Sequence, residues 1–134
     1  MTSLVIVSHS KKLAEGLKEI LEQVARDIRI IAIGGAMASS NSDILGSDPS
    51  KIKETFLSLA NDDAIFVLCD FGSTVLSVKY AIRKLPEDIA KKIYLLDAPL
   101  VEGAYAVAVQ ISAGSTVEEI IKSAEESRSF RKLS

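Results

Sequence analysis

The only histidine of the chain, His9, stands between two serines directly after a short apolar run at residues 4–7. A neutral imidazole can attack phosphorus, and the ordinary histidine pKa of about 6.5 leaves the ring mostly neutral near pH 7. A helical pattern begins after Ser10. The positive end of that helix would favour the neutral ring and attract an incoming phosphate. We therefore predict that His9 is a nucleophile that carries a phosphoryl group.

A second group with suitable chemistry follows the apolar run at residues 64–69, where Asp70 precedes Phe71 and the triplet Gly72, Ser73 and Thr74. A carboxylate commonly orients a catalytic imidazole through its second ring nitrogen. Free N–H groups and hydroxyls at a helix start are suited to phosphoryl oxygens, and phosphoryl transfer requires mainly positioning and charge stabilisation. We predict that Asp70 orients His9 and that the triplet binds the phosphoryl group.

Four further residues are predicted to contact phosphate or a partner protein: Ser10, Gly35, Ser47 and Glu102. Each has a structural alternative. Ser8 or Ser10 would cap the first helix, and Ser47 with Asp48 would cap the next one. The pair Gly34-Gly35 is also explained by a turn, and no GxGxxG or GxxxxGK[ST] pattern accompanies it. Glu102 is also explained as a solvated surface charge.

Alternating strand and helix patterns predict how these residues are positioned. Apolar runs predict strands at residues 4–7, 28–33, 64–69 and 93–96, and helical patterns lie between and after them in the order βαβαβαβαα. This order is typical of an α/β fold with an open parallel four-stranded β-sheet and helices on both faces. Because the carboxyl ends of parallel strands share one edge, His9, Gly35, Asp70 and Glu102 should converge there.

Local signals predict where several helices begin. Asp48 followed by Pro49 predicts an N-cap and a first helical residue, and Ser115 or Thr116 should cap the last helix. The alanine- and valine-rich stretch at 104–111 predicts a tightly packed helix. The small polar segment at 36–49 is long for a loop in so short a chain, which favours a functional role.

Length and composition limit the class of protein. The 134 residues are 48% hydrophobic and 25% charged, which predicts one globular domain, at 1–126, and a frayed polar and basic tail at 127–134. A net charge of −2 gives no support for nucleic-acid binding. One histidine and one cysteine argue against a metal site. We expect a cytoplasmic protein, because the single cysteine suits a reducing compartment and neither a signal peptide nor a membrane-spanning run is apparent.

Other interpretations of the two central residues remain open at this point. A lone histidine at a strand end is often structural, and Asp70 could simply cap the helix that follows it. A receiver domain shares the strand and helix alternation. It would require acidic residues after its first strand, where this chain has Ser8, His9 and Ser10.

Three stretches carry a resemblance to a known family: LVIVSHS at 4–10, DFGS at 70–73 followed by Leu76 and Ser77, and APLVEGA at 98–104. The chain resembles the mannose-class IIA domains of the sugar phosphotransferase system over nearly its whole length. Within that family it is most similar to the phosphotransferase subunits of dihydroxyacetone kinases, because sugar-specific relatives do not typically carry the third stretch. The segment at 34–48 matches more loosely, with Gly46-Ser47 where the family often has Gly-Thr.

The resemblance implies a specific relay. His9 would accept a phosphoryl group from the phosphocarrier protein HPr and pass it to ADP bound on the subunit DhaL, which then phosphorylates dihydroxyacetone held by DhaK. Asp70 would be the aspartate beside the active histidine. The resemblance also implies a homodimer without a permanently bound cofactor, because ADP or ATP and Mg belong to DhaL. Some relatives carry fused HPr-like and enzyme I-like portions. This chain ends after the IIA unit, so we expect its donor to be a separate protein.

Three alternatives compete with this relay. A mannose-type IIA component would use the same histidine but donate to a sugar-specific IIB domain. A regulatory module would keep the phosphoryl group as a signal rather than discharge it quickly. A flavodoxin-like ligand-binding domain would form no covalent intermediate, and its activity would survive His9→Ala.

Overall fold

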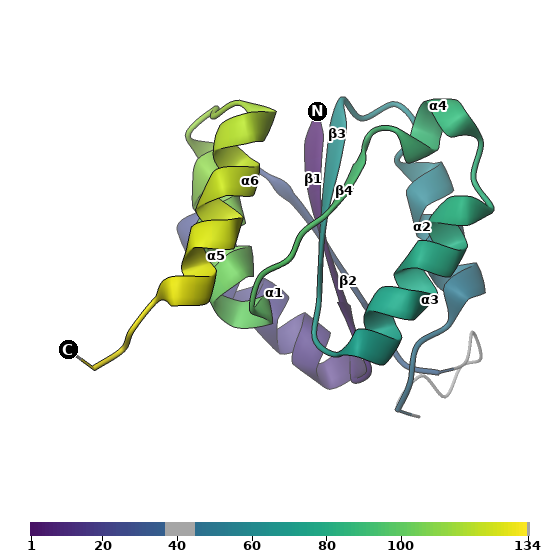
Figure 1. The fold of residues 1–134 in the computed structure, drawn as a ribbon, viewed down its shortest axis with the longest axis horizontal. Coiled ribbons are helices and arrows are strands. Elements are labelled where there is room, and N and C mark those ends of the chain that lie inside the picture. Colours follow the sequence, from purple (N-terminus) through teal and green to yellow (C-terminus); the bar gives the residue numbers. More distant parts are fainter. Residues whose placement is uncertain (37–44, 134) are drawn as a thin grey trace.

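Four parallel strands form the sheet in the computed structural model, which describes residues 1–36 and 45–133 (Figure 1). They are β1 (Thr2–Ser8), β2 (Arg29–Gly34), β3 (Ala64–Cys69) and β4 (Ile93–Leu95). Their order is β2-β1-β3-β4, with all neighbouring pairs parallel. The central strands β1 and β3 are buried on both faces, which explains why their sequences are apolar without alternation.

The helices cover both faces of the sheet, as predicted. They are α1 (Lys11–Val24), α2 (Pro49–Ser58), α3 (Gly72–Arg83), α4 (Glu87–Ala90), α5 (Leu100–Ser112) and α6 (Val117–Glu126). Helices α1, α5 and α6 lie on one side, and α2 and α3 on the other (Figure 1). Successive β1 residues alternate between the two cores: Leu4 and Ile6 pack toward the first group, and Val5 and Val7 toward the second.

The predicted helix starts are confirmed where a polar side chain marks them. Ser10 Oγ accepts the N–H of Leu13, and Asp48 caps α2 with Pro49 in its first turn. Thr116 forms a capping box with Glu119 at α6. Helix α5 begins at Leu100 rather than at 104, because its N-cap is Pro99, which offers no capping side chain to mark the start. The one-turn helix α4 was not predicted.

The chain beyond α6 has more structure than the frayed tail expected from residue 127. Residues Ser127–Ser129 form a 3-10 turn. Ser127 is buried, and its hydroxyl donates to the carbonyl of Ala124 at 2.6 Å. Arg128 pairs with Asp97, in the segment after β4, at 2.9 Å. The start of this segment is therefore ordered, and the Arg128–Asp97 pair joins it to a distant part of the chain.

Two further expectations concern the loop and the membrane. Residues 37–44 of the polar loop lie outside the described residues, and its end at 45–48 leads into α2. Within the described ranges, no helix has the length and apolar character needed to cross a bilayer.

Candidate functional site

The site lies where the two central strands end. In β1 and β3, Val7 pairs with Cys69, so the residues that follow each strand lie side by side. His9 follows β1 and is partly buried, and Asp70 follows β3 with only 10% of its side chain exposed. The structure thus brings together the two residues that the sequence placed at the centre of the site.

The Asp70 carboxylate is a hub of hydrogen bonds. Its Oδ2 accepts the Ser8 hydroxyl at 2.7 Å and the His9 backbone N–H at 2.9 Å. Its Oδ1 accepts the Phe71 N–H and the Thr74 hydroxyl, each at 2.8 Å. Partial burial raises the pKa of Asp70, but these four hydrogen bonds outweigh burial and lower the pKa to about 2. Asp70 is therefore a charged acceptor at neutral pH.

The imidazole of His9 is held at both nitrogens. Nδ1 lies 2.7 Å from Thr74 Oγ1 and 3.3 Å from Asp70 Oδ1, and Nε2 lies 2.6 Å from Ser73 Oγ. The rings of His9 and Phe71 make a T-shaped contact with their centroids 5.4 Å apart. The ring therefore has one nitrogen on the buried aspartate side and the other beside a serine at the start of α3.

The triplet after Asp70 divides into two roles. Ser73 is exposed and adjoins Nε2, which fits the predicted contact with a phosphoryl group. A Cβ at Gly72 would meet nothing within 4 Å, so the space beside the start of α3 is open. Thr74, by contrast, is fully buried and its hydroxyl bonds to the aspartate, so in this structure the hydroxyl faces the interior of the site.

The loop before α2 also reaches the site. Gly46 donates its backbone N–H to the carbonyl of His9 at 2.8 Å. Ser47 Oγ lies 2.6 Å from Ser77 Oγ, and Ser77 donates to the carbonyl of Ser73. Sequence reasoning named Gly46 in the family resemblance but did not assign it to the site. Gly46 has φ +138°, a conformation that favours glycine. The sequence signal for this position was a glycine immediately before the Ser47-Asp48 pair.

The remaining predicted residues shape the surroundings. Ser10 caps α1 and thereby starts that helix directly after His9. Gly35 directly follows β2, is buried and has φ 100°, a conformation that favours glycine. Its neighbour Gly34 meets α1 closely, because a Cβ there would lie 2.6 Å from the Lys11 backbone. Glu102 pairs with Lys132 at 2.7 Å.

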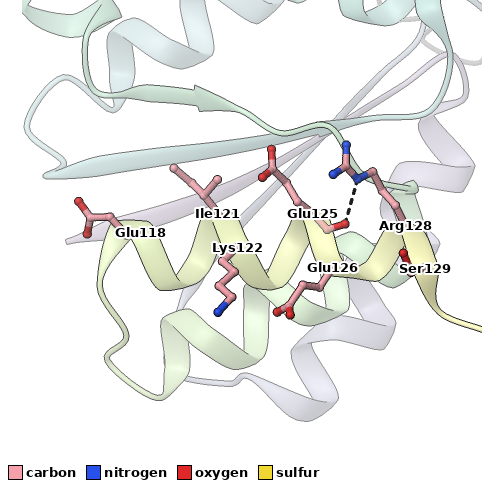
Figure 2. Close-up of a pocket in the computed structure, with 7 residues that line it drawn as sticks. All are labelled: Glu118, Ile121, Lys122, Glu125, Glu126, Arg128 and Ser129. Carbon is pink, nitrogen blue, oxygen red and sulfur yellow. Dashed lines mark hydrogen bonds between the residues drawn. The ribbon is translucent and has the colours of Figure 1, made fainter.

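A groove adjoins this network at Asp70, and a separate hollow lies away from it. Glu102 lines the groove, of about 520 Å³, together with α1 residues and Asp70. The hollow, of about 530 Å³, lies on α6 and the turn after it, where Arg128 donates to the Glu125 carbonyl (Figure 2). All residues lining that hollow come from 118–129, so no strand end contributes to it. In the described part of the chain, no three His, Cys, Asp or Glu side chains gather as metal ligands.

Comparisons with known proteins agree with one another. The family model EIIA-man, described as the PTS system fructose IIA component, matches residues 3–121. A phosphoryl donor subunit DhaM of PEP-dependent dihydroxyacetone kinase 2 from Listeria innocua is 37% identical over 91% of this chain and 95% of its own length. The Klebsiella michiganensis and Escherichia coli K12 DhaM subunits are 41% and 38% identical over 92% and 90% of this chain.

The share of each relative that is matched differs from one relative to the next. The chain spans 26% of the length of the Klebsiella and Escherichia subunits. A crystal structure of a protein of unknown function superimposes with a TM-score of 0.84 at 38% identity, covering 93% of both chains. The fold predicted from the strand and helix order is confirmed.

Proposed function

This chain belongs to the EIIA-man family of phosphotransferase-system IIA components, and we propose that it is the phosphoryl donor subunit of a PEP-dependent dihydroxyacetone kinase. The support is the set of DhaM relatives at up to 41% identity, one of which matches over 95% of its own length. The observation that carries the chemistry is the His9 ring, held on one side by the Asp70 network and with Nε2 beside exposed Ser73.

In this proposal Nε2 of His9 attacks the phosphorus atom of a donor phosphohistidine. The Nε2–P bond forms as the donor N–P bond breaks. The donor imidazole leaves with the electron pair of that broken bond. The His9 ring keeps a proton on Nδ1 and becomes cationic. The negative charge of Asp70 stabilises that cation, which is electrostatic assistance to a step that depends mainly on positioning.

The phosphoryl oxygens would lie at the start of α3. The first N–H groups of any helix lack intrahelical acceptors. Ser73 adds a hydroxyl there, and the space beside Gly72 is open. The start of α1 at Lys11, directly after the Ser10 cap, adds a second helix dipole with its positive end beside His9.

The proposed partners follow from the same assignment. Phospho-HPr is the donor, DhaL with bound ADP is the acceptor, and DhaK holds dihydroxyacetone. Nucleotide and Mg would reside on DhaL, so the chain itself carries only the phosphoryl group. We also propose a cytoplasmic homodimer.

The test is intact-mass spectrometry at neutral to alkaline pH after incubation with phosphoenolpyruvate, enzyme I and HPr, with His9→Ala in parallel. We expect one acid-labile phosphoryl group on the wild-type protein and none on the variant. Adding DhaL loaded with ADP should discharge it. A phosphoryl group that persists would reassign the chain to a sugar IIA component or a regulatory module. The absence of phosphorylation by every donor tried would reassign it to non-covalent binding.

A further inference from the structure

We infer that Thr74 is the positioning residue through which Asp70 acts on the His9 ring: its hydroxyl accepts the Nδ1 proton and thereby leaves the lone pair on Nε2. The inference deepens the proposed function and rests on it for its kinetic consequence. The tautomer itself is a property of the resting protein and can be measured without any partner.

The Asp70 carboxylate has a limited capacity to accept hydrogen bonds. Each carboxylate oxygen has about two acceptor positions. Oδ2 is occupied by the Ser8 hydroxyl and the His9 backbone N–H, and Oδ1 by the Phe71 N–H and the Thr74 hydroxyl. The ring nitrogen Nδ1 is a fifth neighbour at 3.3 Å, longer than all four. The four acceptor positions of Asp70 are therefore occupied by groups other than the His9 ring.

The protons available to Thr74 and Asp70 set the direction of the hydrogen bonds. A threonine hydroxyl has one proton to donate, and a charged carboxylate can only accept. The Thr74 proton therefore goes to Asp70 Oδ1 at 2.8 Å. The same oxygen, 2.7 Å from Nδ1, must accept, so Nδ1 carries the proton. Nε2 then has the lone pair, and the Ser73 hydroxyl at 2.6 Å donates to it.

Burial separates the Thr74 hydroxyl from solvent. Thr74 is 0% exposed, so its hydroxyl is removed from competing solvent, whereas the neighbouring Ser73 is exposed. Successive helix residues point about 100° apart, which explains how adjacent hydroxyls reach opposite ring nitrogens. A buried donor or acceptor without a partner costs free energy. The other tautomer would leave the Thr74 oxygen facing a bare Nδ1, so this arrangement favours a proton on Nδ1.

The experiment compares Thr74→Val, which keeps the shape and removes the hydroxyl, with Thr74→Ser, which restores the hydroxyl. The matched control is Thr55→Val, which removes a hydroxyl that bonds within α2 to the Lys51 carbonyl. Nitrogen-15 NMR of the imidazole reports the tautomer at neutral pH. Rapid-quench phosphorylation by phospho-HPr reports the rate, and circular dichroism confirms that each variant is folded.

We expect wild type, Thr74→Ser and Thr55→Val to show Nδ1 protonated and Nε2 bare. In Thr74→Val the two tautomers should mix, and the rate should fall about fivefold to tenfold, as expected for the loss of one neutral hydrogen bond. An unchanged tautomer and rate in Thr74→Val would overturn the inference and leave direct contact with Asp70 as the orienting bond. If no donor phosphorylates the wild type, the proposed function fails, and the NMR comparison still decides the role of Thr74.

Discussion

Asp70 bonds to the backbone of His9 more closely than to its ring: Oδ2 accepts the backbone N–H at 2.9 Å, whereas Oδ1 lies 3.3 Å from Nδ1. The aspartate therefore fixes the course of the chain as it leaves β1, as well as supplying charge to the site. Its replacement should affect folding and phosphotransfer together.

The variant Asp70→Asn tests this double role. An asparagine has an NH₂ group in place of one carboxylate oxygen. The two N–H or O–H groups that donate to that oxygen would then lose their acceptor. We expect the free energy of unfolding to fall by about 2 kcal/mol and the rate of His9 phosphorylation to fall at least tenfold. Urea unfolding and rapid-quench phosphorylation measure the two effects.

The control for that substitution is Asp97→Asn, because the Asp97 side chain is exposed and pairs with Arg128 on the surface. It should change stability by less than about 0.5 kcal/mol and leave the rate intact. Equal effects of the two substitutions would contradict a special role for Asp70.

Stability should depend on the ionisation of Asp70 in acid. Its pKa in the folded protein is lowered from 3.8 to about 2, so the unfolded state binds the proton more readily. The stabilisation is complete above the unfolded pKa and is lost as the pH falls through 3.8 toward 2. We expect this group to contribute about 1–2 kcal/mol, which Asp70→Asn should abolish. Urea titrations at several acidic pH values measure the difference; parallel curves for the two proteins would refute it.

Gly34 should be required for the packing of α1 against the end of β2. A Cβ there would approach the Lys11 backbone N and Cα to 2.6 Å, so Gly34→Ala must displace the first turn that follows His9. We expect a loss of about 1–3 kcal/mol of stability and slower phosphorylation. Gly16→Ala is the matched control within α1, where a Cβ meets nothing within 4 Å. It should stabilise the helix by up to about 1 kcal/mol, and a neutral Gly34→Ala would show that the turn adjusts freely.

The single thiol should be inert in the folded protein. Burial, and then the negative charge of Asp70, raise the pKa of Cys69 to about 12, and the side chain lies in β3. Because the thiolate is the reactive form, a disulfide reagent at pH 8 should label the native protein far more slowly than the urea-unfolded chain. Rapid labelling of the native protein would show that this end of β3 opens readily.

The helix starts show which structural features depend on nearby residues. Ser10, Asp48 and Thr116 were recognised because a capping side chain acts within three residues of itself. The start of α5 was placed four residues late because Pro99 gives no such signal. The turn at Ser127–Ser129 was missed because one of its contacts, from Arg128 to Asp97, joins residues 31 positions apart.

The sequence by itself determined the α/β fold and the meeting of His9 with Asp70, because strand and helix periodicity and parallel pairing place both residues at one sheet edge. Only the tertiary structure decided which hydrogen bonds form in the site. It turned Ser73 outward and Thr74 inward, filled the carboxylate with four donors, and brought Gly46 to the His9 carbonyl. These outcomes depend on the rotation of α3 and on ångström-scale distances between segments more than 30 residues apart, which local residue patterns do not encode.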